Sequence, residues 1–265
     1  MAEIFNGYWL GYQVPNGPTL NKTPSFIDHL TLFVAGPNPD STLSTDYLCS
    51  QFGEDQIKQW VAEVRSRGQK VFLSLMDSET TPWNEVDMST FGASVEQAIS
   101  AWGLDGLDID AESGMAEEMY VPTFIDLADQ LSSFLRGMGK PLTYTCYQGC
   151  APGSRDYEIL SKIKDQVTFV NLMAYWDDID SYHDLFLEYA NLVGSEKVTF
   201  GIKPGKEGAE ESTQLKTAAL LAKSNPPGGK KAGVMLFATN RDFPELSGQP
   251  EWAYSKLIKK ALQRR

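Results

Sequence analysis

The sequence is poor in cysteine and histidine, and neither residue occurs at the spacing of a zinc site. It has three cysteines and two histidines in 265 residues. There is no CxxC pair, and His29 and His183 stand far apart in the chain. We therefore expect no zinc site and interpret both histidines as structural or surface residues.

Long apolar runs are also missing. None approaches the roughly 20 residues that cross a bilayer, and the amino terminus lacks the basic segment and apolar stretch of a leader peptide. We expect no membrane association, and a chain that is cytoplasmic as it stands or secreted if a leader was removed. Cys49, Cys146 and Cys150 suit a compartment where thiols stay reduced, while their spacing leaves a bridge between Cys146 and Cys150 open.

Basic side chains are outnumbered by acidic ones, 23 to 35, which gives a formal net charge of −12. The Lys and Arg residues form no stripe that would attract phosphates in spite of that charge. We therefore expect no nucleic-acid partner and favour a neutral substrate, bound by a monomer.

Short segments rich in β-branched and aromatic residues recur along the chain, and most precede a segment with apolar residues at helical spacing. The predicted strands are residues 4–11, 29–35, 70–75, 107–111, 142–147, 167–174, 198–202 and 233–238. The predicted helices are residues 55–67, 91–102, 122–135, 181–193, 213–222 and 252–262. Residues 15–27, rich in Pro, Asn and Thr, predict a loop with at most a short helix.

This alternation predicts the α/β class. Right-handed crossovers between parallel strands restrict the sheet to a doubly wound form or a closed barrel. Eight repeats in about 250 residues are the count and size of the closed form. No linker or change of composition marks a second domain, so we predict a single (β/α)₈ TIM barrel over residues 1–265.

The most informative segment is LDGLDIDAE at residues 104–112. Asp108, Asp110 and Glu112 share one face of a strand, with neighbours roughly 6.5–7 Å apart, while the apolar residues between them point the other way. In a barrel the acids point inward and approach the carboxyl end of the strand, where barrel active sites form.

Three stacked acids in a partly buried interior do not all ionise cheaply, so at least one should hold a proton near neutral pH. A protonated carboxyl beside an ionised one is what cleavage of a glycosidic bond requires. Two other interpretations of the spacing remain open, a solvated acidic strand face and a magnesium or calcium site, although no cluster of further oxygen ligands follows Glu112.

Residues 105–112 match in full the DGxDxDxE signature of glycoside hydrolase family 18. That family comprises chitinases and endo-β-N-acetylglucosaminidases on an eight-stranded barrel, with this segment as its fourth strand. NLMAY at 171–175 is similar to the family's Met-x-Tyr element in the sixth strand. FNGYW at 5–9 and GVMLF at 233–237 resemble its first and eighth strands.

The chain departs from the family pattern at three places. Ser74 is followed by Leu-Met-Asp where a pair of glycines is usual, Trp176 stands where chitinases usually have Asp, and Phe237 replaces the usual Trp. These departures slightly favour an endoglycosidase acting on N-glycans, or another unusual N-acetylglucosaminide, over chitin.

The resemblance implies a retaining, substrate-assisted hydrolase with no metal and no cofactor. Glu112 is expected to protonate the leaving oxygen and later to act as base towards water. Asp110 orients the acetamido group that attacks the anomeric carbon, Tyr175 hydrogen-bonds its carbonyl oxygen, and Asp108 modulates the protonation of Asp110. The expected substrate is an N-acetylglucosamine-containing oligosaccharide or N-glycan.

Further substrate-binding candidates lie at or near the ends of predicted strands, although aromatic residues at such places also fill cores. They are Tyr8, Met173, Trp176, Phe237, Tyr147 and Gln148. Residues 240–242, Asn-Arg-Asp, are interpreted either as hydrogen-bond donors and acceptors for a glycan or as a surface ion pair. The alternative function is a glycan-binding, lectin-like barrel without activity, against which the presence of Glu112 counts.

Overall fold

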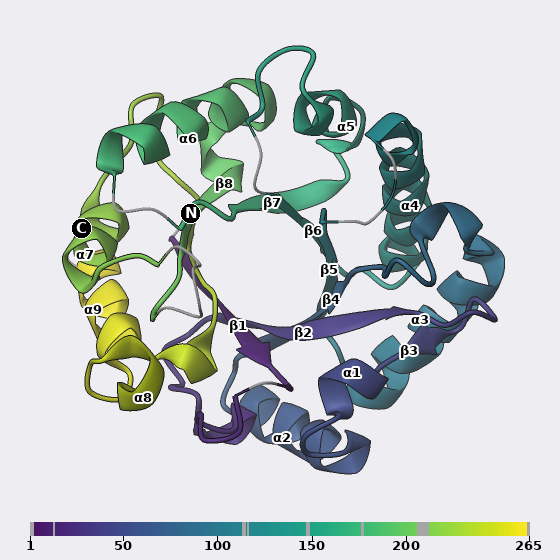
Figure 1. The fold of residues 1–265 in the computed structure, drawn as a ribbon, viewed down its shortest axis with the longest axis horizontal. Helices are drawn as coiled ribbons and strands as arrows, with labels where there is room; N and C mark the ends of the chain where they lie inside the picture. Colours follow the sequence, from purple (N-terminus) through teal and green to yellow (C-terminus); the bar gives the residue numbers. More distant parts are fainter. Residues whose placement is uncertain are drawn as a thin grey trace.

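The computed structural model describes residues 3–12, 14–112, 115, 117–146, 149–175, 178–205 and 212–263. Within these residues, eight parallel strands close into a barrel, seen from one end in Figure 1. They are β1 (Ile4–Leu10), β2 (His29–Pro37), β4 (Lys70–Leu75), β5 (Gly106–Asp110), β6 (Leu142–Cys146), β7 (Val167–Leu172), β8 (Val198–Ile202) and β9 (Gly233–Leu236). The short β3 (Leu43–Ser44) pairs antiparallel with the end of β2.

The barrel closes because β1 pairs with both β2 and β9. Each other strand pairs in parallel with its neighbours in chain order, and β5 is the fourth barrel strand. The predicted (β/α)₈ barrel is therefore confirmed, and the predicted strands agree with the observed ones to within two residues at each end.

Helices form a ring outside the strands (Figure 1). The long ones are α2 (Glu54–Ser66), α3 (Met88–Trp102), α4 (Glu117–Gly137), α5 (Arg155–Ile163), α6 (Ile179–Val193), α7 (Leu215–Lys223) and α9 (Ala253–Leu262). Shorter helical pieces are α1 (Asp46–Cys49), α8 (Pro244–Ser247), η1 (Leu20–Lys22), η2 (Trp83–Glu85), η3 (Ser195–Lys197) and η4 (Thr239–Arg241). No helix in the part of the chain that the structure describes is long and apolar enough to cross a membrane.

Among the long helices, α4 and α5 differ most from the prediction, and the short α1 and α8 were not predicted. α5 was not predicted, and its first two residues, Arg155 and Asp156, are charged yet buried. Its amino-terminal signal is Ser154, whose hydroxyl accepts a hydrogen bond from Tyr157 N. α4 begins at Glu117, so Pro122 lies inside the helix instead of at its start. In residues 15–27 the only helical turn among the described residues is η1, as predicted.

The strands divide the core into two environments. Residues that point outward, such as Leu107 and Ile109, are fully buried against the helices, as predicted. At the amino-terminal end of the strands, the His29 ring packs between Phe72 and Phe169, with centroid distances of 5.1 and 5.8 Å. Burial lowers the pKa of His29 to about 4, so the ring is neutral there and its role is packing.

Candidate active site

The barrel interior above this packed base is polar, and Asp108 lies within it with no exposed surface. Its carboxylate accepts four hydrogen bonds from hydroxyl groups on β1 and on the two strands that pair with β5. Tyr8 and Ser74 donate to Oδ2 at 2.7 and 2.9 Å, and Thr143 and Thr145 donate to Oδ1 at 2.6 and 2.9 Å. Burial raises the pKa of Asp108, and the four donors oppose that rise because they stabilise the ionised form.

A second polar layer supports these hydroxyls. The side-chain amide of Asn171 donates to Thr145 Oγ1 at 3.0 Å and to the Tyr8 hydroxyl at 3.3 Å. Its oxygen accepts from Thr199 at 2.9 Å. The inward face of five strands thus orients the groups that hold Asp108. These hydroxyl residues were not predicted as part of the site, although their alternation on predicted strands marks Ser74, Thr143 and Thr145 as inward-facing.

Asp110 lies one step further along the same face of β5 and is only 2% exposed. Burial, followed by the charges of Glu112 and Asp108, raises its pKa well above the usual range of an aspartate. Burial and the neighbouring charges thus favour the protonated form of this carboxyl. Among the described residues, its Oδ1 is buried and has no hydrogen-bond partner.

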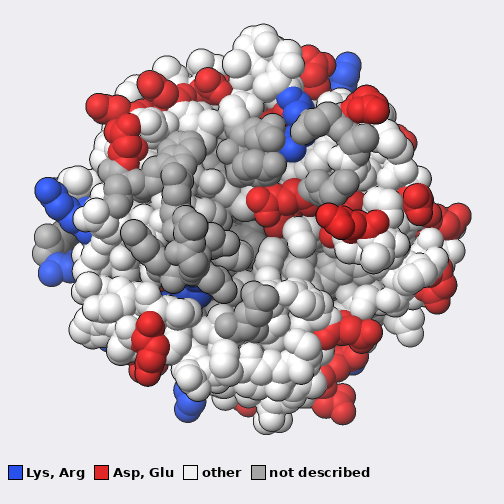
Figure 2. Space-filling view, viewed as in Figure 1, with Lys and Arg blue, Asp and Glu red and all other residues white. Residues whose placement is uncertain are grey.

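Glu112 follows the end of β5 and reaches solvent at the rim of the barrel. The surrounding protein desolvates its inner side, which raises the pKa of the carboxyl, while Arg155 and Lys203 act in the opposite direction. Both cations are nearly buried. Figure 2 shows that acidic side chains outnumber basic ones on the face that looks down the barrel. Two cations beside Glu112 are therefore a local exception that the sequence analysis did not identify.

Tyr175 approaches the same region from the end of β7. Its hydroxyl is buried and has no partner in the described part of the chain. Burial, then the charges of Glu112 and Asp110, raise the pKa of this phenol well above its usual range, so it stays a neutral donor. Its ring stacks on Phe237 at 6.0 Å, and Lys203 Nζ lies 5.6 Å from its centroid.

The other predicted substrate-binding residues fall into two groups. Phe237 and Met173 are half-buried near the rim and pack in one apolar cluster with Tyr175. Tyr8 is 1% exposed, and its hydroxyl bonds Asp108 beneath the surface. Trp176, Tyr147 and Gln148 lie outside the described residues.

One of the two interpretations offered for residues 240–242, a surface ion pair, is wrong, whereas hydrogen bonding to a glycan stays a prediction. Asn240, Arg241 and Asp242 are all buried. Asn240 exchanges two hydrogen bonds with the backbone of Leu10, so it fixes the end of β1. Asp242 accepts bonds from the start of α9. Their roles depend on contacts with distant segments, which the local sequence does not reveal.

Neither a metal cluster nor a disulfide is found in the part of the chain that the structure describes. No group of three or more His, Cys, Asp or Glu side chains there has the arrangement of a metal site. Cys49, Cys146 and Cys150 are free thiols, so the bridge left open by the sequence is not present.

A closed barrel whose fourth strand carries an inward ladder of carboxyl groups has the architecture of a glycoside hydrolase. The family model of the endo-β-N-acetylglucosaminidase EndoS TIM-barrel domain matches residues 8–236. That match spans most of the chain, and the chain therefore belongs to glycoside hydrolase family 18.

Solved structures share the fold at low sequence identity. The catalytic domain of a family GH18 chitinase from the fern Peteris ryukyuensis is 17% identical, with a TM-score of 0.77 over 98% of this chain and 99% of that one. A GH18 chitinase from Pseudoalteromonas aurantia is 17% identical, with a TM-score of 0.75 over 98% and 99%. The endo-β-N-acetylglucosaminidase from Cordyceps militaris is 17% identical, with a TM-score of 0.73 over 99% and 91%. At such identities these likenesses concern the fold alone.

Proposed function

We propose that this protein is a retaining β-N-acetylglucosaminidase that uses the acetamido group of its own substrate as nucleophile. The observation that carries the proposal is the row of three carboxyl groups along β5 and directly after it, which differ in burial and in proton affinity. Asp108 is buried and held by four hydroxyls, Asp110 is buried and disposed to hold a proton, and Glu112 reaches solvent at the rim. Glu112 can meet a substrate at the surface, and the carboxyls beneath it hold their protons with different affinities. This arrangement suits Glu112 as a general acid.

In the first step Glu112 gives its proton to the glycosidic oxygen, and the C1–O bond breaks as the acetamido carbonyl oxygen attacks the anomeric carbon. The product of this step is an oxazolinium ion and a free leaving alcohol. The substrate supplies the nucleophile, so a second carboxylate on the opposite face of the sugar is not required.

Asp110 and Tyr175 are proposed to hold the acetamido group for this attack. Each presents a buried oxygen that has no protein partner among the described residues. Such an oxygen is costly unless a ligand satisfies it. An acetamido group has one N–H donor and one carbonyl acceptor, which match a carboxyl oxygen and a phenol hydroxyl.

In the second step Glu112, now ionised, removes a proton from water as the water attacks the anomeric carbon. The oxazolinium opens, the acetamido group is regenerated, and Glu112 regains its proton. Arg155 and Lys203, which lower the pKa of Glu112, stabilise the ionised form needed for this step.

As substrate we propose an N-glycan cleaved beside N-acetylglucosamine, with chitin oligosaccharides as the competing candidate. The matching family model is that of an endo-β-N-acetylglucosaminidase. The structural neighbours include chitinases and one such endoglycosidase. Phe237 in place of the usual tryptophan also favours an unusual sugar subsite.

The test compares wild type with Glu112→Gln on chitin oligosaccharides and, separately, on a high-mannose N-glycopeptide. Glutamine keeps the shape of the side chain but has no proton to give, so cleavage should slow by roughly 10²–10⁴-fold while binding is retained. Product formation is followed by chromatography and binding by calorimetry.

Cleavage of the glycopeptide alone assigns an endoglycosidase, and cleavage of the oligomers alone assigns a chitinase. If wild type cleaves neither and both proteins bind a glycan equally, the protein is a lectin-like member of the family and the proposal is wrong.

A further inference from the structure

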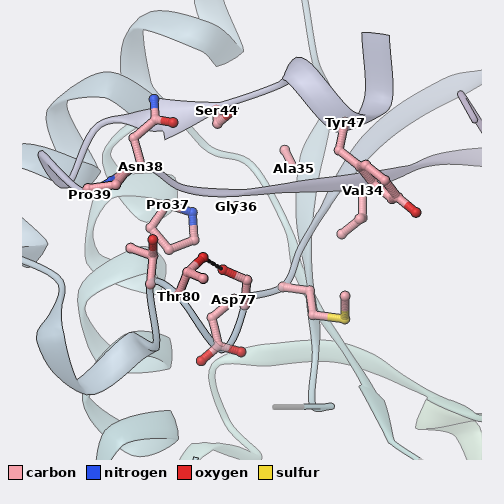
Figure 3. A pocket seen from close by; sticks show the side chains of 13 residues that line it. Val34, Ala35, Gly36, Pro37, Asn38, Pro39, Ser44, Tyr47, Asp77 and Thr80 are labelled. Carbon is pink, nitrogen blue, oxygen red and sulfur yellow. Dashed lines mark hydrogen bonds between the residues drawn. The ribbon is translucent and has the colours of Figure 1, made fainter. Parts of the chain in front are cut away.

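A pocket of about 480 Å³ lies at the carboxyl-terminal rim of the barrel, between the end of β2 and the loop that follows β4 (Figure 3). The two strands pair for the last time at Ala35 and Leu75, and beyond that pair their chain segments form opposite walls. At the base the walls approach closely, since a β-carbon on Gly36 would lie 2.2 Å from the carbonyl oxygen of Met76. The volume lies within the range of roughly 300–1,000 Å³ that is usual for ligand pockets.

One end of the pocket lies level with the row of carboxyl groups. Ser74 pairs with Asp108 in the register of β4 and β5, and its hydroxyl donates to that carboxylate, so it faces the barrel interior. Met76 follows Ser74 by two residues and therefore lies on the same side, level with Asp110. Met76 also packs on the apolar cluster that Tyr175 joins. Because Met76 lines the pocket, the pocket opens at the mouth of the barrel beside the row.

Aromatic rings in contact connect the pocket with the proposed acetamido site. Tyr47 of α1 lines the pocket and is 51% exposed. Its ring centroid lies 4.0 Å from that of Tyr12, which lies 6.2 Å from that of Phe33. Phe33 in turn lies 5.3 Å from Phe237, the ring on which Tyr175 stacks. A ligand that extends from the site along these rings reaches the exposed face of Tyr47.

The polar side chains of the pocket suit a ligand that is rich in hydroxyl groups. Asp77 is only 5% exposed, and the backbone N–H of Trp83 fixes its carboxylate by donating to Oδ2 at 2.8 Å. Asn38 lies across the pocket from Asp77 and Thr80 (Figure 3). All other side chains in this described lining are neutral. The pocket thus offers one carboxylate acceptor together with amide and hydroxyl groups that both donate and accept.

We propose that this pocket is a second sugar subsite, which binds a neutral hexose of the substrate away from the scissile bond and excludes sugars that carry a carboxylate. The Tyr47 ring packs on the apolar face of the hexose, and Asp77 accepts hydrogen bonds from its hydroxyls. An anionic sugar is repelled because the Asp77 carboxylate lies in a nearly buried wall, where solvent screens charge poorly. This inference rests on the proposed function of the carboxyl row.

The direction of the pocket favours an arm of a branched glycan as its occupant. Asp77 directly follows Met76 and, by the alternation along the strand, faces away from the barrel interior. The pocket therefore extends outward from the mouth, between β2 and the loop after β4. An arm can lie there while Glu112 acts on the core of the same glycan. We therefore expect neutral, high-mannose arms to be preferred to arms that end in sialic acid.

The kinetic test compares a high-mannose N-glycopeptide with the same glycopeptide trimmed to a single mannose. In Tyr47→Ala the KM for the full glycopeptide should rise about 3–10-fold more than the KM for the trimmed one, with similar kcat values, because only the full glycan reaches the ring. Tyr47→Phe keeps the ring and should restore the wild-type ratio. Leu220→Ala is the matched control, since Leu220 is 48% exposed on α7. Equal KM changes for both glycopeptides in Tyr47→Ala contradict the proposal.

A binding test that needs no turnover separates this inference from the proposed function. The probe is a trimannoside without N-acetylglucosamine, and the signal is the ¹³C-labelled methyl group of Met76, assigned with Met76→Leu. The trimannoside should shift this signal in wild type and much less in Tyr47→Ala. The same trimannoside oxidised to a carboxylate at its terminal C6 should bind at least about 10-fold more weakly, and Asp77→Asn should reduce that difference. Asparagine retains an oxygen for the Trp83 N–H.

Three results overturn the proposal: no shift of the Met76 signal, a shift that Tyr47→Ala leaves unchanged, or equal binding of the neutral and oxidised trimannosides. Binding of a lysine-containing tripeptide in place of the trimannoside also overturns it, because it would identify a cation site. If the trimannoside binds as expected and wild type cleaves neither proposed substrate, the subsite stands and only the proposed function is wrong.

Discussion

At the scale of single residues, the raised pKa of Asp110 makes the folded protein less stable as the pH rises. An aspartate has a pKa of about 3.9 in an unfolded chain, whereas burial and neighbouring charge raise the pKa of Asp110 well above that in the folded protein. As pH rises from about 4 towards the folded pKa, the unfolded state ionises first and the folded state loses stability. Asparagine at this position does not have this penalty.

We therefore predict that Asp110→Asn melts higher than wild type at pH 8, with a difference at least about 2 °C larger than at pH 4. Activity should fall at the same time, because the acetamido group loses a partner. The measurement is the melting temperature of both proteins at the two pH values. Glu96→Gln, at an exposed site on α3, is the control, and its melting temperature should differ from that of wild type by the same amount at both pH values. The account is contradicted if the difference in melting temperature between Asp110→Asn and wild type is the same at pH 4 and pH 8.

At the scale of elements, the last helix depends on a carboxylate that precedes it by eleven residues. Asp242 is fully buried and accepts hydrogen bonds from the backbone N–H groups of Tyr254 and Ser255, at 3.0 and 2.8 Å, and from the Ser255 hydroxyl. The two backbone N–H groups belong to the first turn of α9 and so have no carbonyl partner within the helix. Among the described residues, no other side chain caps that end.

We predict that Asp242→Ala lowers the melting temperature by about 5–10 °C, because three buried donors lose their acceptor. Asp87→Ala is the matched comparison, since Asp87 is an exposed cap that accepts from Thr90 N at the start of α3. It should lower the melting temperature by only about 2–4 °C. Equal losses in thermal melts contradict the importance of burial at Asp242.

The strands were predictable from the sequence because their outward residues are uniformly apolar. Leu107 and Ile109 are examples, and both pack on the helices. α5 was not predictable in the same way, since its buried first turn is held by an ion pair between Arg155 and Asp156 and by the stacking of Arg155 on Tyr120 at 4.1 Å. Ile159, Leu160 and Ile163 of α5 do stand at helical spacing, but the charged first turn confines that apolar pattern to the rest of a short helix.

At the scale of the whole molecule, closure of the barrel brings residues of different strands together. Contacts of this kind cannot be predicted from the sequence of a single strand. The three acids on β5 and directly after it were predictable because alternate residues of one extended segment share one face. Their partners Ser74 and Thr143 lie on other strands, and Lys203 directly follows β8. Only the closed barrel brings them to the acids. Spacing along one segment contains no information about that register.

The central claim is that Glu112 acts with the acetamido group of the substrate and not with a directly attacking water. The most direct test is the anomeric configuration of the first product, read by ¹H NMR within minutes of adding enzyme to chitin oligosaccharides or to the N-glycopeptide, before mutarotation. Two displacements at the same carbon preserve configuration, so the account predicts that the new reducing end appears first as the β-anomer. Initial release of the α-anomer would mean a single displacement by water and would contradict the mechanism.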